Sequence, residues 1–468
     1  MTSLIRIIEV EINNFKNVES GKVTFNSCTC SNKKGKSDNV LGIYGQNASG
    51  KTTFIEALYL LKILLSGEKI NSFLLELLRN GENSFFKYTF YIQSKVESYK
   101  VSYSFELGKD KLNNKVEVRK EKIKCSIFNG EVKTNTKTII DYNIDNDCYN
   151  VIKPIATYNM FTKNEKNKIG LLISKALSKE NNISFVFNQS SMNNYRTAFG
   201  EESEYYKILD SLNYFGKHNL LVLCSECLNG NIDGLTLGVR YKLFSEDKEN
   251  MLIELRKSET NKLNDNSYEV IQGVIENINT VLESIIPGFK LGIKKKNKAL
   301  IQEYDIEREL EFVSIRDNLE FPFKYEAEGT RKIVSILGLM IAVYNDPKVC
   351  LVIDELDSGM FEYLFGEILT VFGENSKGQF IFTANNLRGL EVLDKRSIIF
   401  TTTNPKNKYI KFKGVKTTNN LRSLYLRSII YGGQEECLYK STDKEKIDRK
   451  LKTSWNKKYG DIMKKIYD

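Results

Sequence analysis

Histidine is almost absent from this sequence, which has a single one, His218, in 468 residues. No serine or cysteine nucleophile motif lies near it, so hydrolase chemistry built on a histidine base is excluded. The eight cysteines are scattered, and Cys224 and Cys227 form a lone CxxC motif. With no second pair of cysteines and only one histidine, a zinc site is hard to complete. We interpret the two cysteines as buried reduced thiols on an apolar strand.

Long hydrophobic runs are also missing. The longest, Ile333 to Tyr344, is too short to cross a bilayer. The first twenty residues already carry Glu9, Glu11 and Lys16 and have no apolar core, so they do not read as a signal peptide. We therefore expect a cytoplasmic protein with no membrane partner.

The chain is long enough for two or three lobes, and its 41% hydrophobic and 27% charged content is typical of globular proteins. The net charge of +10 favours polyanionic partners such as nucleic acid, but only weakly. The lysines are spread along the chain, often beside asparagine. Biased genome composition is therefore an alternative explanation for the excess.

A complete phosphate-binding motif, GxxxxGK[ST], lies in "VLGIYGQNASGKTTFIEALYLLK". Val40 to Tyr44 reads as a buried strand, and the residues from Thr53 onward have helical spacing. In this context the loop amides and the helix N-terminus bind phosphate oxygens, Lys51 reaches the β and γ phosphates, and Thr52 places its hydroxyl on Mg²⁺. A chance glycine loop is the alternative. The predicted nucleotide-binding residues of the loop are Gly45, Gln46, Asn47, Ala48, Ser49, Gly50, Lys51, Thr52 and Thr53.

A second stretch, "KVCLVIDELDSGM", supplies the carboxylates that such a loop needs. Val349 to Ile353 reads as a buried parallel strand that ends in Asp354 and Glu355. Asp354 is the candidate Mg²⁺ ligand, and Glu355 is the candidate that polarises the attacking water. A strand ending in DE is common by chance, but together with the upstream loop it indicates a Mg²⁺–ATP site. The 303 residues between Lys51 and Asp354 (354 − 51) require insertions.

Two further patterns lie near this strand. Gly329 and Thr330 precede a run of helical period, and a glycine at a helix N-terminus can present free N–H groups to an anion. A plain helix cap explains that pattern equally well. The stretch "IFTANNLRG", from Ile381 to Gly389, is a short apolar strand that ends in two asparagines.

Taken in order, "NNFKN", the phosphate loop, "EGT", the DE strand with "LDSG", and a strand ending in a polar pair resemble an ABC-type ATPase head of the SMC, RecF and OLD kind. Within that group the chain is most similar to single-head AAA ATPases of bacterial abortive infection and anti-phage defence, such as AbiLi-like proteins and the ATPase subunit of the PARIS system. The resemblance covers residues 1–60 and about 300–435. It implies an α/β fold: an ABC-type P-loop head with an antiparallel β lobe and a mixed, mainly helical insertion.

The resemblance also implies a composite site, in which two heads meet head to tail with ATP between them. Glu326 to Thr330 takes the signature position, so Glu328, Gly329 and Thr330 would contact the nucleotide bound to the partner head. Leu356 to Gly359 takes the D-loop position, with Asp357 as its nucleotide-binding residue. Asn385 takes the catalytic switch position, and Gln93 is a weak candidate for the Q-loop.

Two residues depart from the family pattern. Ala327 stands where a serine hydroxyl usually meets the γ-phosphate, and Asn385 stands where a histidine is usual. Asparagine can donate a hydrogen bond, but it cannot take a proton. Each lost contact costs on the order of 10²-fold in rate, which predicts slow hydrolysis.

The domain organisation that we predict has four parts. The first is 1–154, the N-terminal half of the head with the phosphate loop and a β lobe; the second is 155–287, the mixed insertion. They are followed by 288–439, the C-terminal half with signature, Walker B, D-loop and switch, and by the basic tail 440–468. The tail could contact nucleic acid or a partner protein, or it could be a solvated helix. Within the insertion, the Asn and Lys cluster near 163–168 predicts an exposed loop.

Together with the Mg²⁺–ATP motifs, the resemblance implies an ATP-dependent sensor or scaffold in phage defence, with ATP and Mg²⁺ as cofactors, that forms a homodimer or larger homo-oligomer through ATP-bridged heads. The 83 residues after Asn385 (468 − 385) show no run of acidic metal ligands, so we expect the effector, a nuclease or toxin, to be a separate chain. The alternatives are a RecF-like DNA-binding repair ATPase and a nucleotide-binding scaffold with negligible hydrolysis.

Overall fold

The computed structural model describes most of the chain in thirteen segments. They are 3–25, 39–79, 82–94, 97–110, 115–128, 135–146, 148–224, 234–240, 250–256, 261–263, 265–301, 305–414 and 420–454. Within these segments, no helix has the length and apolar character needed to span a membrane. Cys227 lies outside them. Its predicted partner Cys224 is buried at the end of a strand, but it is disulfide-bonded, so the expectation of a reduced thiol is wrong at that position.

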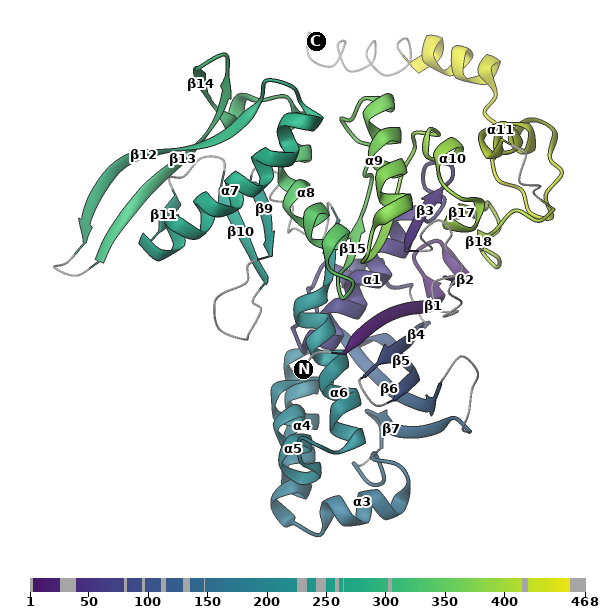
Figure 1. The fold of residues 1–468 in the computed structure, drawn as a ribbon. Coiled ribbons are helices and arrows are strands. Elements are labelled where there is room, and N and C mark those ends of the chain that lie inside the picture. The colour runs from purple at the N-terminus through teal and green to yellow at the C-terminus, as the bar shows by residue number, and fades with distance from the viewer. Residues whose placement is uncertain are drawn as a thin grey trace, which may run out of the picture.

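A central six-stranded sheet carries the phosphate loop, and its strand order is β18-β17-β3-β16-β15-β8 (Figure 1). All neighbours are parallel except β17 and β18. Both faces of β3, β15 and β16 are buried, because helices cover the sheet on both sides. The strands are β3 (Val40–Tyr44), β8 (Leu220–Leu223), β15 (Cys350–Ile353), β16 (Gln379–Thr383), β17 (Ile398–Thr401) and β18 (Tyr409–Ile410).

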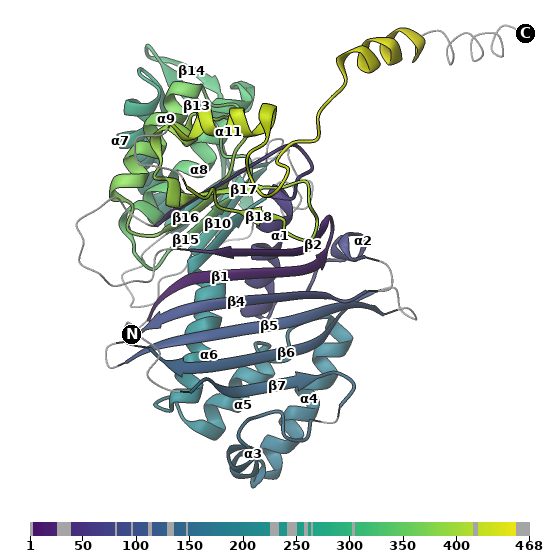
Figure 2. The same cartoon turned by 90° about the vertical axis from the view of Figure 1, so that its right-hand side faces the viewer.

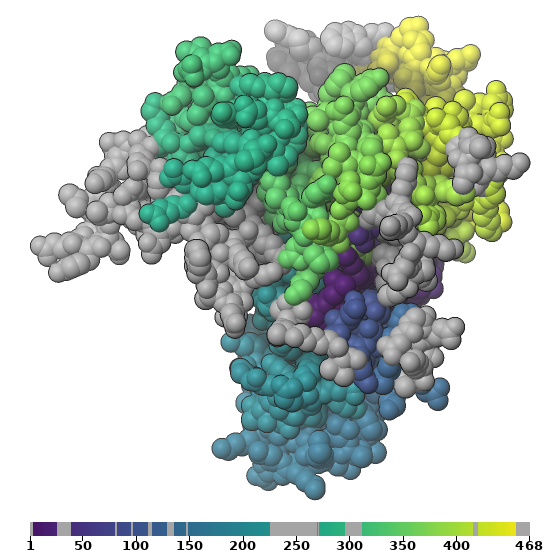
Figure 3. Space-filling view, in the orientation of Figure 1, coloured from purple at the N-terminus to yellow at the C-terminus, as the bar shows by residue number. Residues whose placement is uncertain are grey.

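Helix α1 (Lys51–Ser66) lies between this sheet and a second one, and it is almost wholly buried. The opposite face of the central sheet is covered by helices of the C-terminal half, which share one apolar core with it. These helices are α8 (Glu328–Asn345), α9 (Glu362–Asn375), α10 (Gly389–Val392), η3 (Lys395–Ser397) and α11 (Leu421–Tyr431). In Figure 3 the N-terminal segments, in purple, are visible between the C-terminal half above and the lower lobe.

The second sheet is antiparallel, with the order β2-β1-β4-β5-β6-β7, and it is seen face-on in Figure 2. Its strands alternate between a face buried against α1 and an outer face of partly exposed residues, which is typical of an antiparallel sheet with one solvated side. This confirms the predicted β lobe. The strands are β1 (Leu4–Phe15), β2 (Val18–Thr24), β4 (Ser84–Gln93), β5 (Ser98–Asp110), β6 (Lys115–Ile127) and β7 (Lys137–Asn143), with α2 (Leu74–Leu77) beside them.

Helices α3 (Ile155–Thr162), α4 (Glu165–Asn181), α5 (Gln189–Phe199) and α6 (Glu204–Tyr214), followed by η1 (Phe215–Asn219), cover the inner face of this sheet (Figure 2). A buried carboxylate joins them to the sheet. Glu121 of β6 accepts hydrogen bonds from the hydroxyls of Tyr103 and Ser184 at 2.5 and 2.6 Å and from the backbone N–H of Phe185 at 2.6 Å.

The remaining elements form a third group beside α8. They are β9 (Gly234–Arg240), β10 (Asn250–Arg256), β11 (Asn261–Leu263), α7 (Asp265–Ile285), β12 (Lys290–Ile301), β13 (Asp305–Arg316), β14 (Leu319–Pro322) and η2 (Phe323–Tyr325). The apolar face of α7 packs with β12, β13 and α8 in a core of its own. The α/β class, the β lobe and a mixed insertion with helices are therefore confirmed, and the insertion also contributes β8 to the central sheet.

Candidate functional site

The phosphate loop connects β3 to α1, as the motif predicts. Ala48 and Gly50 both have left-handed backbone conformations, with φ of 60° and 103°. These angles bend the loop so that α1 begins at Lys51 with Gly50 as its cap, and no side chain caps that end. The first N–H groups of a helix have no partner within the helix and therefore suit an anion.

Lys51 lies almost buried at the centre of the loop, with 7% of its surface exposed. Its Nζ donates to the carbonyl oxygens of Gly45 at 2.7 Å and Gln46 at 3.2 Å. Burial lowers the pKa of Lys51, and the nearby charges of Asp354, Glu355 and Asp357 act in the opposite direction. The lysine and the three predicted carboxylates therefore share one electrostatic environment, although 303 residues (354 − 51) separate Lys51 from the first of them.

Two side chains that were not among the predicted site residues brace the loop. Asn17, from the turn between β1 and β2, donates from Nδ2 to the carbonyl of Ala48 at 2.6 Å and accepts from Thr53 at 3.1 Å. Tyr409 of β18 donates to the carbonyl of Gly50 at 2.8 Å. The only sequence signal for either of them was Asn17, the last residue of the "NNFKN" stretch.

The other side of the loop touches the C-terminal half. The Ser49 hydroxyl is hydrogen-bonded to that of Thr401, at the end of β17. The side chain of Gln46 makes two hydrogen bonds with the backbone of Lys440: Oε1 accepts from its N–H at 3.0 Å, and Nε2 donates to its carbonyl at 3.4 Å. Of the predicted binding residues, Gln46 therefore holds the start of the tail with its side chain, while Asn47 is exposed.

Asp354 and Glu355 follow β15, beside the strand end of β16, and Thr383 of β16 positions both of them. The Thr383 hydroxyl donates to Oδ1 of Asp354 and accepts the backbone N–H of Glu355 at 2.8 Å. Thr383 itself is fully buried. Glu355 has a φ of 48°, and its residue surface is exposed. Thr383 thus fixes the carboxylate of Asp354, the candidate metal ligand, whereas Glu355, the candidate that polarises water, is exposed.

Asp357, at the predicted D-loop position, binds the backbone of Asn385, at the predicted switch position of the same chain. Oδ2 of Asp357 accepts the backbone N–H groups of Asn385 at 3.0 Å and Asn386 at 2.7 Å. The side chain of Asn386 then accepts the N–H of Arg388 at 2.9 Å and closes the turn. Asn385 is exposed, so its amide is free to meet a ligand.

The signature position lies at the start of α8. Ala327 is the N-cap and makes no side-chain cap hydrogen bond, and Glu328 already belongs to the helix. The expectation that Gly329 and Thr330 precede the helix is therefore wrong: both lie in its first turn, where their N–H groups still lack intrahelical acceptors. Gly329 touches the D-loop, because a Cβ added to it would lie 1.9 Å from the carbonyl oxygen of Gly359.

A basic residue that the sequence did not single out, Lys332 of α8, lies one turn after Glu328. Its Nζ donates to the carbonyl of Glu355. Burial lowers the pKa of Lys332, while the negative charges of Asp357, Glu355 and Asp354 raise it. This hydrogen bond therefore joins α8 to the backbone of the segment that carries the predicted carboxylates.

Gln93 is not part of this arrangement. It pairs with Leu4 at the beginning of β1, whereas Asn17, which touches the loop, follows the other end of β1 at Phe15. With a rise of about 3.3 Å per residue, the strand keeps the two ends roughly 35 Å apart. Gln93 as a Q-loop residue is therefore wrong.

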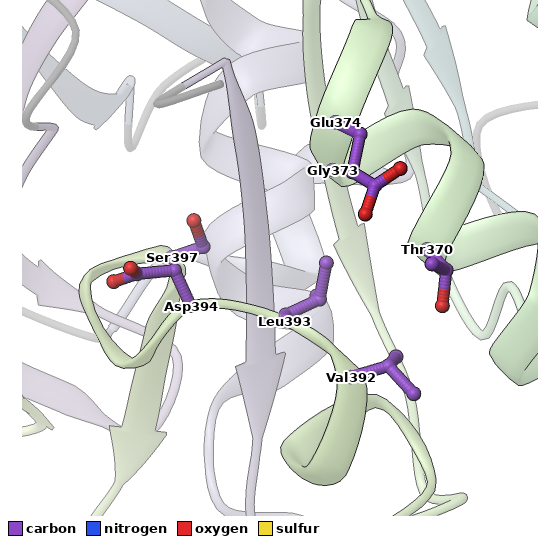
Figure 4. Close-up of a pocket in the computed structure, with 7 residues that line it drawn as sticks. All are labelled: Thr370, Gly373, Glu374, Val392, Leu393, Asp394 and Ser397. Carbon is purple, nitrogen blue, oxygen red and sulfur yellow. The ribbon is translucent and has the colours of Figure 1, made fainter. Parts of the chain in front are cut away.

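A small pocket lies between α9 and the segment that follows α10 (Figure 4). Thr370 and Glu374 line one side, and Leu393 and Asp394 line the other. No residue of the phosphate loop contributes to it. The candidate site is therefore the open surface at the carboxyl ends of β3, β15 and β16, and not this pocket.

The residues at these strand ends fit ATP with Mg²⁺. The loop amides and Lys51 supply the positive groups that phosphates need, and Thr52 and Asp354 supply the oxygen ligands that Mg²⁺ prefers. The described segments contain no group of three or more histidine, cysteine, aspartate or glutamate side chains that could hold a metal ion. Site residues contributed by a second copy remain predictions.

Residues 40–143 match the sequence model of the family described as "AAA domain, putative AbiEii toxin, Type IV TA system". The match spans the phosphate loop, α1 and most of the antiparallel sheet. A search of curated proteins gives no match.

Among solved structures, the chain is similar to an Smc head bound to the C-terminal winged-helix domain of ScpA, with 12% identity over 87% of this chain and 97% of that chain and a TM-score of 0.41. The SMC head domain of Thermotoga maritima is 14% identical over 87% of this chain and 99% of its own, with a TM-score of 0.37. The recombination mediator RecF with ATP is 14% identical over 82% and 93%, with a TM-score of 0.33.

Proposed function

We propose that this chain binds ATP with Mg²⁺ and hydrolyses it slowly, and that it serves as a sensor or scaffold in bacterial anti-phage defence that controls a separate effector. The observation that supports the proposal is that the side chain of Lys51 feels the charges of Asp354, Glu355 and Asp357, near the carboxyl ends of β3 and β15, the parallel strands that flank β16. Local sequence patterns predicted Lys51, Asp354 and Glu355, and the resemblance predicted Asp357.

Each residue has a role that follows from its position. Lys51 leaves the carbonyl oxygens of Gly45 and Gln46 and moves its cation to the β and γ phosphates. Thr52 and Asp354 would hold the Mg²⁺, whose charge would offset that of the phosphates. Glu355, which is exposed, would polarise the water that attacks the γ-phosphate.

Slow turnover follows from the two unusual positions. The Asn385 amide can donate a hydrogen bond toward the γ-phosphate or the attacking water, but it cannot accept the proton as histidine does. Ala327 offers no hydroxyl at the signature position. The remaining signature contacts are backbone N–H groups of the first turn of α8 and the Thr330 hydroxyl. We propose that these act on the nucleotide of a second copy.

The defence role is supported by the family match over residues 40–143, whose description links it to an abortive-infection toxin. We propose that the toxic or nucleolytic activity belongs to a separate effector chain.

A RecF-like role on DNA is the second candidate. The net charge of +10 favours it. The outer face of the antiparallel sheet argues against DNA binding, because its lysines alternate with acidic partners. Lys122 pairs with Asp141 at 2.9 Å, and Lys120 pairs with Glu106 at 3.1 Å. Interspersed charges of both signs make a poor surface for a phosphate backbone.

The test compares wild type with Lys51→Ala and Glu355→Gln, using Lys207→Ala as an exposed lysine control that pairs only with Glu202. We expect Lys51→Ala to lose ATP binding and phage protection, and Glu355→Gln to bind ATP but release little phosphate. Equal protection by Lys51→Ala and wild type would contradict an ATP-dependent role. Stimulation of hydrolysis by duplex DNA, weakening steeply with salt, would favour the RecF-like alternative instead.

A further inference from the structure

The outward face of α4 is the more apolar of its two faces. Ile169, Leu172 and Ile173 are 54%, 53% and 49% exposed, and Ala176 is also exposed. Their spacing of i, i+3, i+4 and i+7 forms one continuous stripe along the helix. We call these four residues the α4 stripe. A surface helix normally turns such a stripe toward the core, so its outward position requires an explanation.

The inner face of α4 is fixed by small polar residues. Ser178 donates to the carbonyl of Ile183 at 2.6 Å, and Ser174 donates to the hydroxyl of Ser190 at 3.2 Å. Gly170 allows close contact with α5, since a Cβ there would lie 2.2 Å from Nδ2 of Asn194. These contacts fix the rotation of the helix. The α4 stripe therefore faces outward because the fold holds it there, and within the described residues the stripe adds nothing to the core.

Lysines line the edges of the stripe. At 100° per residue, Lys168 and Lys179 lie along one edge and Lys166 lies on the other, while the exposed Glu165 and Glu180 lie in line with the stripe beyond its two ends. All three are exposed, and none forms an ion pair with a described residue. An apolar stripe with basic edges suits a partner helix that has an apolar stripe and acidic edges.

A second copy of the same helix fits poorly. In a symmetric antiparallel pair, each edge of the helix meets the same edge of its partner, because the interface is isologous. Lys168 and Lys179 would then face the lysines of the other copy, which is destabilising. The charges therefore favour a different protein.

We propose that the α4 stripe is the docking site for an amphipathic helix with acidic edges that belongs to a separate protein. The site lies on the insertion and shares no residue with the phosphate loop. Docking there does not depend on the proposed ATPase activity, so Lys51→Ala is expected to bind the partner helix as wild type does.

The experiment uses the full chain and two synthetic helical peptides of about 20 residues, which share a leucine stripe and differ in carrying glutamates or lysines along its edges. Fluorescence anisotropy measures their binding to wild type, Leu172→Ser/Ile173→Ser and Lys168→Glu/Lys179→Glu. The control is Leu426→Ser/Ile430→Ser, an exposed apolar pair on α11 that is 40% and 69% exposed. Thermal unfolding checks that every variant is folded.

We expect the glutamate peptide to bind at least tenfold more tightly than the lysine peptide. Leu172→Ser/Ile173→Ser should weaken the affinity for the glutamate peptide at least tenfold. Lys168→Glu/Lys179→Glu should weaken it several-fold, and the control Leu426→Ser/Ile430→Ser should leave it unchanged. Equal binding of both peptides, or of wild type and the α4 serine pair, overturns the proposal. The proposal is also overturned if sedimentation shows that the wild type is a dimer and that Leu172→Ser/Ile173→Ser is a monomer. The stripe would then bind a second copy of the chain.

Discussion

The carboxylate of Asp357 holds the backbone of Asn385, with 3.0 Å between Oδ2 and the amide nitrogen. Since the same oxygen also accepts the N–H of Asn386, the D-loop position fixes the turn after β16 and leaves the Asn385 side chain exposed. Asn385 is thus a constrained residue with a free amide, and not a loose strand end.

Replacing Asn385 tests its role in hydrolysis. Asn385→His should raise phosphate release, or at least not abolish it, because the imidazole restores a proton acceptor. Asn385→Ala should lower release on the order of 10- to 100-fold, as expected for the loss of a donor to transition-state charge. Release is measured at saturating ATP, with bound nucleotide quantified separately. If both variants hydrolyse ATP at the wild-type rate, Asn385 plays no part in catalysis.

Thr383 is expected to act on the rate without touching ATP. Thr383→Val keeps the shape but removes the hydroxyl that joins the Asp354 carboxylate to the Glu355 N–H. We expect kcat to fall on the order of 10-fold with little change in ATP affinity, because misplaced catalytic groups lower the rate. Thr383→Ser should restore most of the activity.

The control for Thr383 is Thr370→Val, whose hydroxyl donates only to the carbonyl of Gly366, one turn back in α9. A loss of activity in Thr370→Val equal to that of Thr383→Val would mean that the effect is general destabilisation. Full activity in Thr383→Val would contradict the proposal that the Thr383 hydroxyl positions Asp354 and Glu355 for hydrolysis.

Gly329 couples the signature helix to the D-loop by close backbone contact. In Gly329→Ala the Cβ would lie 1.9 Å from the Gly359 carbonyl oxygen, so one of the two segments must move. We expect hydrolysis and any ATP-induced self-association, followed by light scattering, to be lost. Gly273→Ala on α7 is the matched control, since nothing lies within 4 Å of the added atom. It should be neutral or stabilise by up to about 1 kcal/mol. Normal activity in Gly329→Ala would contradict the coupling.

Glu121 is expected to matter for stability. In Glu121→Ala the hydroxyls of Tyr103 and Ser184 and the N–H of Phe185 lose their buried acceptor. The free energy of unfolding, measured with urea, should fall by about 3–5 kcal/mol. Glu106→Ala, which breaks only the exposed pair with Lys120, should cost less than about 1 kcal/mol. Equal losses in the two variants would show that the buried network contributes nothing beyond a surface pair.

The phosphate loop and the DE strand could be predicted from sequence because each is a local pattern with a fixed chemistry. Strand, loop and helix are contiguous between Val40 and Ser66, and Asp354 directly follows its strand. Thr383 could not be found in this way. Its role depends on the pairing of β16 with β15, and a threonine at the end of a strand has no distinctive signal.

The errors have physical causes of the same kind. Gln93 lies on an alternating strand, and the sequence does not say which end of the sheet approaches the loop. The cluster near 163–168 was expected to be a loop, but Asn164 caps α4 by accepting the N–H of Lys166 at 3.0 Å, so the helix begins at Glu165. The same polar composition suits a helix cap and a loop.

The bracing of the phosphate loop also bears on how the protein is made. Asn17 leaves the ribosome before the loop, but Thr401, Tyr409 and Lys440 are synthesised long after it. A nascent chain therefore cannot hold its nucleotide loop in the final shape until almost the whole head has emerged. Chains interrupted before Thr401 therefore lack the contacts that Thr401, Tyr409 and Lys440 make with the loop.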